Sequence, residues 1–195
     1  MTYLRRELNM GANPHHLILG QLNDFLTGQI LDDTLDERYR QKIAKKLVMD
    51  KGFRQPDIIS NYRLEVGAGG KTATIRVDFL VQMATKSVIL VKYAPGSLVT
   101  RRLSTLALSR IIEPYQIPIV VFTNGEDAEI MDGHTGCVIA EGLDQIPEKK
   151  DLEHKISSLP FNTITASVFD KASRIAFACE IDGACPCDTD VCVVD

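Results

Sequence analysis

The chain has 195 residues, of which 45% are hydrophobic and 25% are charged, and its formal net charge is -4. This length is sufficient for one well-packed core and short for two complete domains, so we expect one main domain with an extension. The net negative charge excludes a globally basic nucleic-acid coat protein, although a local basic groove remains compatible with it.

The N-terminal segment, residues 1–20, does not resemble a secretory signal. It contains two arginines but lacks a long apolar core followed by a small-residue cleavage site. No apolar run approaches the roughly 20 residues of a membrane-spanning helix. We therefore expect a cytoplasmic protein that does not associate with membranes, whose five cysteines are free thiols or metal ligands rather than a disulfide framework.

The first quarter of the chain predicts two helices. Residues 14–27 are typical of a short helix that ends at Thr27 and Gly28. Residues 35–50 carry apolar side chains at a spacing of four, which predicts an amphipathic helix. Thr34 is suited to cap the N terminus of this second helix.

The hydrophobic period then changes from about 3.6 residues to 2, which indicates strands. Residues 62–66, 73–82 and 87–93 predict an antiparallel meander, because short turns separate them. A further helix is expected over residues 98–113, since Pro114 cannot continue it.

The segment that follows predicts the centre of the sheet. Residues 117–125 are almost wholly apolar, as in a buried central strand, and residues 127–139 predict two strands around a turn. This order implies an α/β fold with a mixed central sheet. Two further helices and a cysteine-rich tail are expected after residue 146, so we divide the chain into residues 1–146 and residues 147–195.

Two lone charges of opposite sign occur on successive predicted strands. Lys92 ends the apolar run "SVILV", and Asp78 is the acid within "RVDFLV". One interpretation is a structural ion pair, or a lysine whose stem packs while its ammonium reaches water. The other is an active site, because metal-assisted phosphodiester cleavage needs carboxylates for Mg²⁺ and a cation near the scissile phosphate.

Several segments together resemble a known family. They are "DERYRQKIAKKLVMDKGF", "RVDFLV", "VILVKYAPGS" and "IPIVVFTNGEDAEIMDGHTGCVI". Their order and spacing are similar to the N-terminal domain of type I restriction enzyme R subunits, a branch of the PD-(D/E)xK nuclease superfamily. The resemblance covers about residues 17–146 and implies a restriction-endonuclease-like α/β/α core that hydrolyses DNA with Mg²⁺.

The resemblance also implies partners and roles for individual residues. Asp78 matches the metal-binding aspartate, Lys92 the catalytic lysine and Glu37 the helical glutamate, so Asp78 and Glu37 would hold Mg²⁺. Gln41 lies one turn beyond Glu37 on the same face and is expected to contact DNA. Besides DNA, we expect restriction-modification or helicase subunits, or a second copy of the chain, as partners.

This sequence departs from the family pattern at Leu90. Members with an intact site carry Glu or Asp two residues before the lysine, and leucine offers no lone pair to a cation. Glu65 would fill the vacancy only if its side chain pointed toward it. We therefore expect weakened cleavage, and the alternative is a non-catalytic DNA-binding or assembly module that retains the nuclease fold.

Arginines near the predicted helix of residues 98–113 are candidate phosphate contacts. Arg101, Arg102 and Arg110 lie on or beside it and would make DNA binding dependent on salt. The other interpretation is a solvated helix face.

The C-terminal cysteines are candidate metal ligands. Their positions are Cys179, Cys185, Cys187 and Cys192. Four thiolates suit Zn²⁺ or an iron-sulfur cluster, but the paired CxxC spacing is missing, so free or oxidisable thiols remain the alternative. A redox or metal-sensing protein is accordingly a third hypothesis for the function. Cys137 is expected to be a small apolar core residue.

Overall fold

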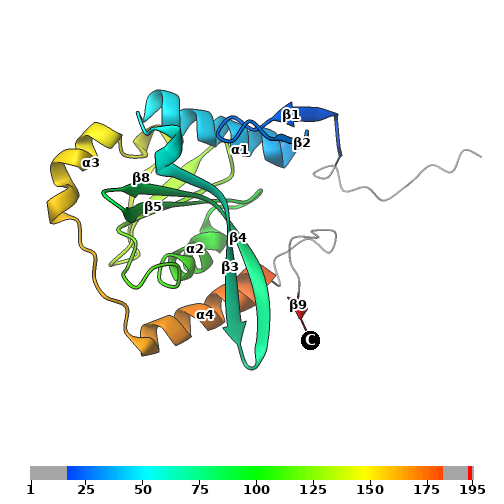
Figure 1. Ribbon diagram of the computed structural model, residues 1–195. Coiled ribbons are helices and arrows are strands. Elements are labelled where there is room, and N and C mark those ends of the chain that lie inside the picture. The colour runs from blue at the N-terminus through cyan, green and yellow to red at the C-terminus, as the bar shows by residue number, and fades with distance from the viewer. Residues whose placement is uncertain (1–16, 182–192, 195) are drawn as a thin grey trace, which may run out of the picture.

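The computed structural model describes residues 17–181 and 193–194, which form a mixed sheet with helices on both faces (Figure 1). The strand order is β3-β4-β5-β6-β7-β8, and β5 and β6 are parallel while the other neighbours in this order are antiparallel. The strands of this sheet are β3 (Ile58–Ala68), β4 (Lys71–Met83), β5 (Lys86–Tyr93), β6 (Ile119–Thr123), β7 (Ala128–Asp132) and β8 (Val138–Glu141). A short strand, β9 (Val193–Val194), pairs with the beginning of β4.

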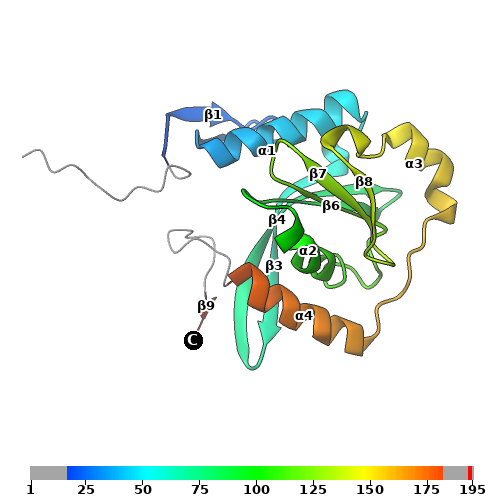
Figure 2. The same cartoon turned by 180° about the vertical axis from the view of Figure 1, so that it is seen from behind.

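The helices form one layer on each face of the sheet. Their bounds are α1 (Leu35–Lys45), α2 (Arg102–Leu108), α3 (Lys149–Lys155) and α4 (Ala166–Ile181). Side chains of α1 and α3 pack in one apolar core, and side chains of α2 and α4 pack in the other. Figure 2 shows α2 and α4 next to each other beneath the sheet, with α1 and α3 above it.

The long helix has the signals that its sequence predicts. The Thr34 hydroxyl accepts the N–H of Glu37 at 3.1 Å and so satisfies a donor that the first turn leaves free. Asp36 and Glu37 lie in the first turn, where negative charge is favourable. A π-helical turn, Lys46–Asp50, extends α1 over the predicted residues 35–50.

The alternation of β4 changes at Asp78. Side chains two residues apart on a regular strand share a face, yet Val77 belongs to the core beside α2 and α4, while Phe79 belongs to the core beside α1. On β3, Asn61 has a positive φ of 54° at the same level of the sheet, between the pairs Ser60–Phe79 and Tyr62–Val77. The hairpin is therefore irregular where Asp78 lies.

Most sequence expectations about the fold are confirmed. The α/β class, the mixed sheet, the antiparallel meander, the buried strand β6 and the hairpin of β7 and β8 are all present. None of the helices within residues 17–181 is long and apolar enough to cross a membrane. The division after residue 146 stays a prediction.

The expected helix over residues 14–27 is wrong for the residues that the structure describes. Gln21–Asn23 forms strand β1, which pairs with β2 (Ile30–Asp32). The Asp24 carboxylate accepts the N–H groups of Leu26 and Thr27, so a side chain closes the turn where a helix would need main-chain bonds.

Two further expectations need correction. The helix expected over residues 98–113 is shorter, because a 3₁₀ turn, Val99–Arg101, precedes α2 and the helix ends at Leu108. Beyond it, the Ser109 hydroxyl donates to the carbonyl of Leu106, which competes with continued helix. Cys137 is exposed instead of buried, since it precedes β8 in the turn after β7.

A glycine in the turn between β7 and β8 gives a test of the fold. A Cβ on Gly133 would lie 2.0 Å from the carbonyl oxygen of Ile117, which is too close for any rearrangement short of moving the backbone. We expect Gly133→Ala to lower the free energy of unfolding by about 1–3 kcal/mol or more in urea denaturation. Gly67→Ala is the control, because its nearest neighbour would be 3.6 Å away. Equal stability of the two variants would contradict this packing.

Candidate functional site

The candidate site lies where β4 and β5 separate. Their main-chain pairing ends at Phe79 and Val91, so the next residues have no ladder partner across this edge. The Asp78 carboxylate accepts the N–H of Tyr93 at 2.7 Å, and the Lys92 ammonium donates to the carbonyl of Arg76 at 2.8 Å. Two charged side chains thus satisfy main-chain groups that the ladder leaves unpaired.

Helix α1 supplies a cation to Asp78. The Nε of Arg40 donates to this carboxylate at 2.8 Å, and Asp78 is only 2% exposed. Burial opposes ionisation of Asp78, but the positive charges of Lys92, Arg40 and Arg76 and the Tyr93 N–H outweigh it. The pKa of Asp78 therefore lies below its ordinary value, and the residue is a carboxylate at neutral pH.

The second carboxylate comes from the same helix. Glu37 is buried, and its Oε1 accepts a hydrogen bond from Gln41 at 2.8 Å. Its Oε2 lies 3.6 Å from Arg40 and 3.8 Å from Arg76. Arg40 consequently joins Glu37 to Asp78.

A third carboxylate reaches the site from α4. Glu180 Oε2 lies 3.4 Å from the Lys92 ammonium. Its Oε1 is buried and has no hydrogen-bond partner among the residues that the structure describes. Sequence reasoning missed Glu180; the signal was an acid that continues the apolar stripe of Ala172 and Ala176 at a spacing of four.

These contacts form one charged seam through the gap between β4 and β5, with α1 at one end and α4 at the other. Lys92 and Asp78 belong to it together, as the sequence predicts, and Glu37 joins them through Arg40. The seam contains three acids and three bases, so its formal charge is zero when all are ionised. We define the charged seam by Glu37, Arg40, Arg76, Asp78, Lys92 and Glu180.

Leu90 and Glu65 contribute no carboxylate to the seam. Leu90 is fully buried in the apolar core beside α2 and α4. Glu65 is exposed on β3 in register with Thr74. The first seam residue along β4 is Arg76, two positions further on. Within residues 17–181 and 193–194, no group of three or more His, Cys, Asp or Glu side chains is arranged to hold a metal ion.

The residues expected to contact DNA have partners within the protein. Arg102 donates twice to Glu129, at 2.5 Å each, and Arg101 donates to the carbonyl of Cys179 at 3.4 Å. Gln41 is buried; it donates to Asp24 and Glu37 and accepts the N–H of Phe25. Arg110, from the same sequence stretch as Arg101 and Arg102, donates to Gln116.

Of the tail cysteines, only Cys179 falls within the described residues, where it is an exposed thiol near the end of α4. Cys185, Cys187 and Cys192 lie outside the described residues, so the proposed zinc or iron-sulfur site stays a prediction.

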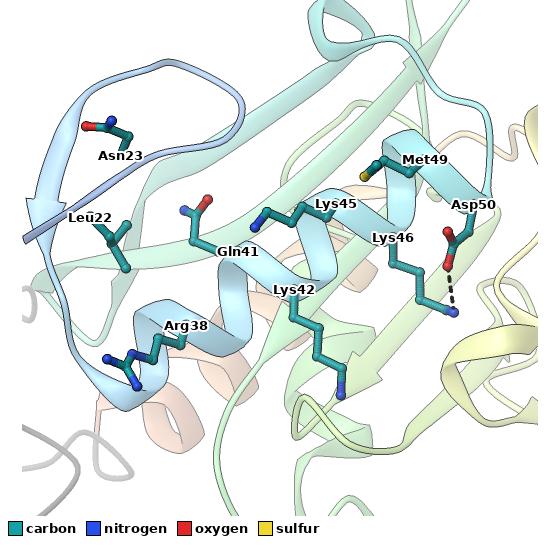
Figure 3. A pocket seen from close by; sticks show the side chains of 9 residues that line it. All are labelled: Leu22, Asn23, Arg38, Gln41, Lys42, Lys45, Lys46, Met49 and Asp50. Atoms are coloured by element: carbon teal, nitrogen blue, oxygen red, sulfur yellow. Dashed lines mark hydrogen bonds and ion pairs between the residues drawn. The ribbon is translucent and has the colours of Figure 1, made fainter.

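A groove with a basic lining lies beside the seam, between α1 and the β1 strand (Figure 3). Its volume is about 540 Å³. Gln41 connects the groove to the seam, because it lines the groove and also donates to Glu37. Lys46 is paired with Asp50 and Asp144, while Lys45 is exposed. We call this the basic groove, and its lining residues are Leu22, Asn23, Arg38, Gln41, Lys42, Lys45, Lys46, Met49 and Asp50.

The buried pair of Asp78 and Arg40 predicts a pH-dependent contribution to stability. A carboxyl with a lowered pKa in the folded state stabilises the fold above its ordinary pKa and loses this effect as pH falls through the folded-state value. We expect Asp78→Asn to lower the free energy of unfolding by about 3 kcal/mol at pH 7. The difference from wild type should shrink as pH falls below about 4, measured by urea denaturation.

Asp151→Asn is the matched control, because Asp151 is exposed on α3. Its effect should be small at every pH. If the free energy of unfolding of Asp78→Asn differs from that of wild type by the same amount down to about pH 2.5, the lowered pKa of Asp78 is contradicted.

Comparison with known proteins identifies a family. The family model described as the type I restriction enzyme R protein N terminus matches residues 35–147, which is more than half of the chain. The match includes α1, β3 to β8 and the seam except for Glu180. No curated protein and no solved structure matches the chain. The chain therefore belongs to the family of type I restriction enzyme R protein N-terminal domains.

Proposed function

We propose that the chain is a DNA-hydrolysing domain of the type I restriction R-subunit kind that uses Mg²⁺. The observation that carries this proposal is the meeting of Asp78 and Lys92 at the separation of two strands. Family membership supports DNA and the subunits of a restriction-modification complex as partners.

The charges of the seam suggest how DNA would engage it. The side chains of Arg40, Arg76 and Lys92 keep 20%, 25% and 14% of their surface exposed, so an entering phosphate can reach them. A phosphate is a strong acceptor for guanidinium groups. When Arg40 turns from Asp78 to a phosphate, it leaves one Asp78 oxygen available to a cation.

The residues at the site fit a magnesium ion that is held largely by waters and phosphates. Mg²⁺ commonly binds through one or two carboxylates and keeps several waters, so it does not need a complete protein cage. Asp78 and Glu37 are the carboxylates that the family pattern assigns to it. When bound, the ion would polarise the phosphoryl group and lower the pKa of a bound water.

Lys92 would act beside the reacting phosphate. Its side chain is only 14% exposed, and its ammonium is fixed by the Arg76 carbonyl and by Glu180. A preorganised positive charge at this position stabilises negative charge that develops on the phosphate oxygens.

A non-catalytic DNA-binding or assembly module is the second candidate, and one observation favours it. Both oxygens of Asp78 are occupied, one by Arg40 and one by the Tyr93 N–H, while Leu90 replaces the second acid of the family pattern. In this case, the arginines of the seam would bind phosphates without a metal.

Plasmid nicking by the full chain distinguishes the two candidates. The hydrolase should nick DNA with Mg²⁺ or Mn²⁺ but not in EDTA, and Lys92→Ala should reduce the rate by about 100-fold or more. Lys155→Ala is the control, because this lysine is exposed on α3. DNA binding in EDTA without nicking under any divalent ion would refute hydrolysis and establish the module.

The basic groove predicts a second, independent effect on DNA binding. Each lysine that contacts a phosphate releases about one counterion, so Lys45→Ala should weaken binding and reduce the slope of log affinity against log salt by about 1. Fluorescence anisotropy with a labelled duplex in EDTA measures this slope. A slope equal to that of wild type would exclude the groove from the DNA interface.

A further inference from the structure

The position of Glu180 follows from the way α4 packs against α2 and over β3 and β4. Ala172 and Ala176 of α4 are buried in the same apolar core as Leu90. Glu180 lies one turn beyond Ala176 on the same helix face, and Lys92 lies two residues beyond Leu90 on the same strand face. The apolar core that α4 and β5 share is thus followed by an ion pair between them at 3.4 Å.

The second oxygen of Glu180 is unusual for a buried carboxylate. The side chain is only 6% exposed, and Oε1 has no hydrogen-bond partner among the described residues. A buried oxygen that lacks a donor is unfavourable, and the cost is greater for a charged group. The site therefore presents a carboxylate oxygen that a cation would stabilise.

We propose that Glu180 supplies the carboxylate that position 90 lacks, and that Asp78 and Glu180 together hold the divalent cation beside Lys92. This inference rests on the proposed hydrolytic function and adds a metal ligand from α4 to Asp78 and Glu37. Lys92 links the two acids, because its ammonium is 3.4 Å from Glu180 and its charge also acts on Asp78.

Two features of α4 support a cation at this place. The last turn is attached to the α2 region, since Arg101 donates to the carbonyl of Cys179 at 3.4 Å. The C-terminal end of a helix also carries partial negative charge, which favours a nearby cation. Glu180 itself lies outside residues 35–147, which match the family model, so the replacement acid would come from the C-terminal extension.

Calorimetric titration of the full chain with Mn²⁺ alone tests the proposal. We expect Glu180→Gln to weaken Mn²⁺ binding by about tenfold or more, because losing even a group that only supports a ligand costs this much. Glu153→Gln is the matched control, since Glu153 is exposed on helix α3, and its affinity should equal that of wild type.

Glu180→Asp separates a metal ligand from a purely structural ion pair. This variant keeps a negative charge near Lys92 but withdraws the carboxylate by one methylene, so the fold should be retained while Mn²⁺ binding weakens. Circular dichroism and thermal unfolding check the fold of each variant. Wild-type affinity in both Glu180 variants would overturn the proposal.

Asp78→Asn makes the failure of this inference distinguishable from the failure of the proposed function. If Asp78→Asn weakens Mn²⁺ binding while both Glu180 variants bind normally, the hydrolytic function stands and Glu180 is not a ligand. If wild-type protein neither binds Mn²⁺ nor nicks DNA, both proposals are overturned. If both acids are ligands, the Mg²⁺ concentration that gives half-maximal nicking should rise in Glu180→Gln by the same factor as the Mn²⁺ dissociation constant.

Discussion

The break in the ladder between β4 and β5 determines the arrangement of the candidate site. A buried strand end that loses its neighbour leaves N–H and C=O groups that must find other partners. Here the Asp78 carboxylate accepts a hydrogen bond from the N–H of Tyr93, and the Lys92 ammonium donates one to the carbonyl of Arg76. Asp78 and Lys92 are therefore structural residues as well as candidate catalytic residues, which explains why charges are tolerated in strands that are otherwise apolar.

The two helical layers contribute opposite ends of the seam. Helix α1 brings Glu37 and Arg40 to the gap from one face, and α4 brings Glu180 from the other. The irregularity of β4 at Asp78 makes this arrangement possible. Val77, before Asp78, packs in the core beside α2 and α4, whereas Phe79, after it, packs in the core beside α1. A regular strand would direct the carboxylate to one helical layer alone.

The sequence was sufficient for the main elements and for part of the site. Strong periodicity located α1 and the meander, and the lone charges in apolar strands identified Asp78 and Lys92. The sequence was insufficient where contacts between distant segments determine which side chains meet. Glu180 lies far beyond Lys92 along the chain, and no local pattern relates the two residues.

Other differences between expectation and structure have local causes that the sequence pattern does not reveal. The Asp24 side chain replaces main-chain helix bonds in its turn, so a segment with apolar spacing becomes a strand and a turn. In this case, polar contacts of one side chain outweigh a weak helix propensity. Arg102 donates twice to Glu129 on β7, and its expected contact with DNA stays a prediction.

Under the proposed function, the charge balance of the seam would relate metal binding to DNA binding. With three acids and three bases, the seam has no net charge, so a divalent ion would be held by individual carboxylates and not by a general negative potential. A phosphate that binds Arg40 or Arg76 removes a cation from the carboxylates and adds negative charge, so it favours the ion. By thermodynamic linkage, a bound ion must favour DNA to the same extent. Under the proposed function, the site would therefore bind its metal ion more tightly when DNA is present than when it is absent.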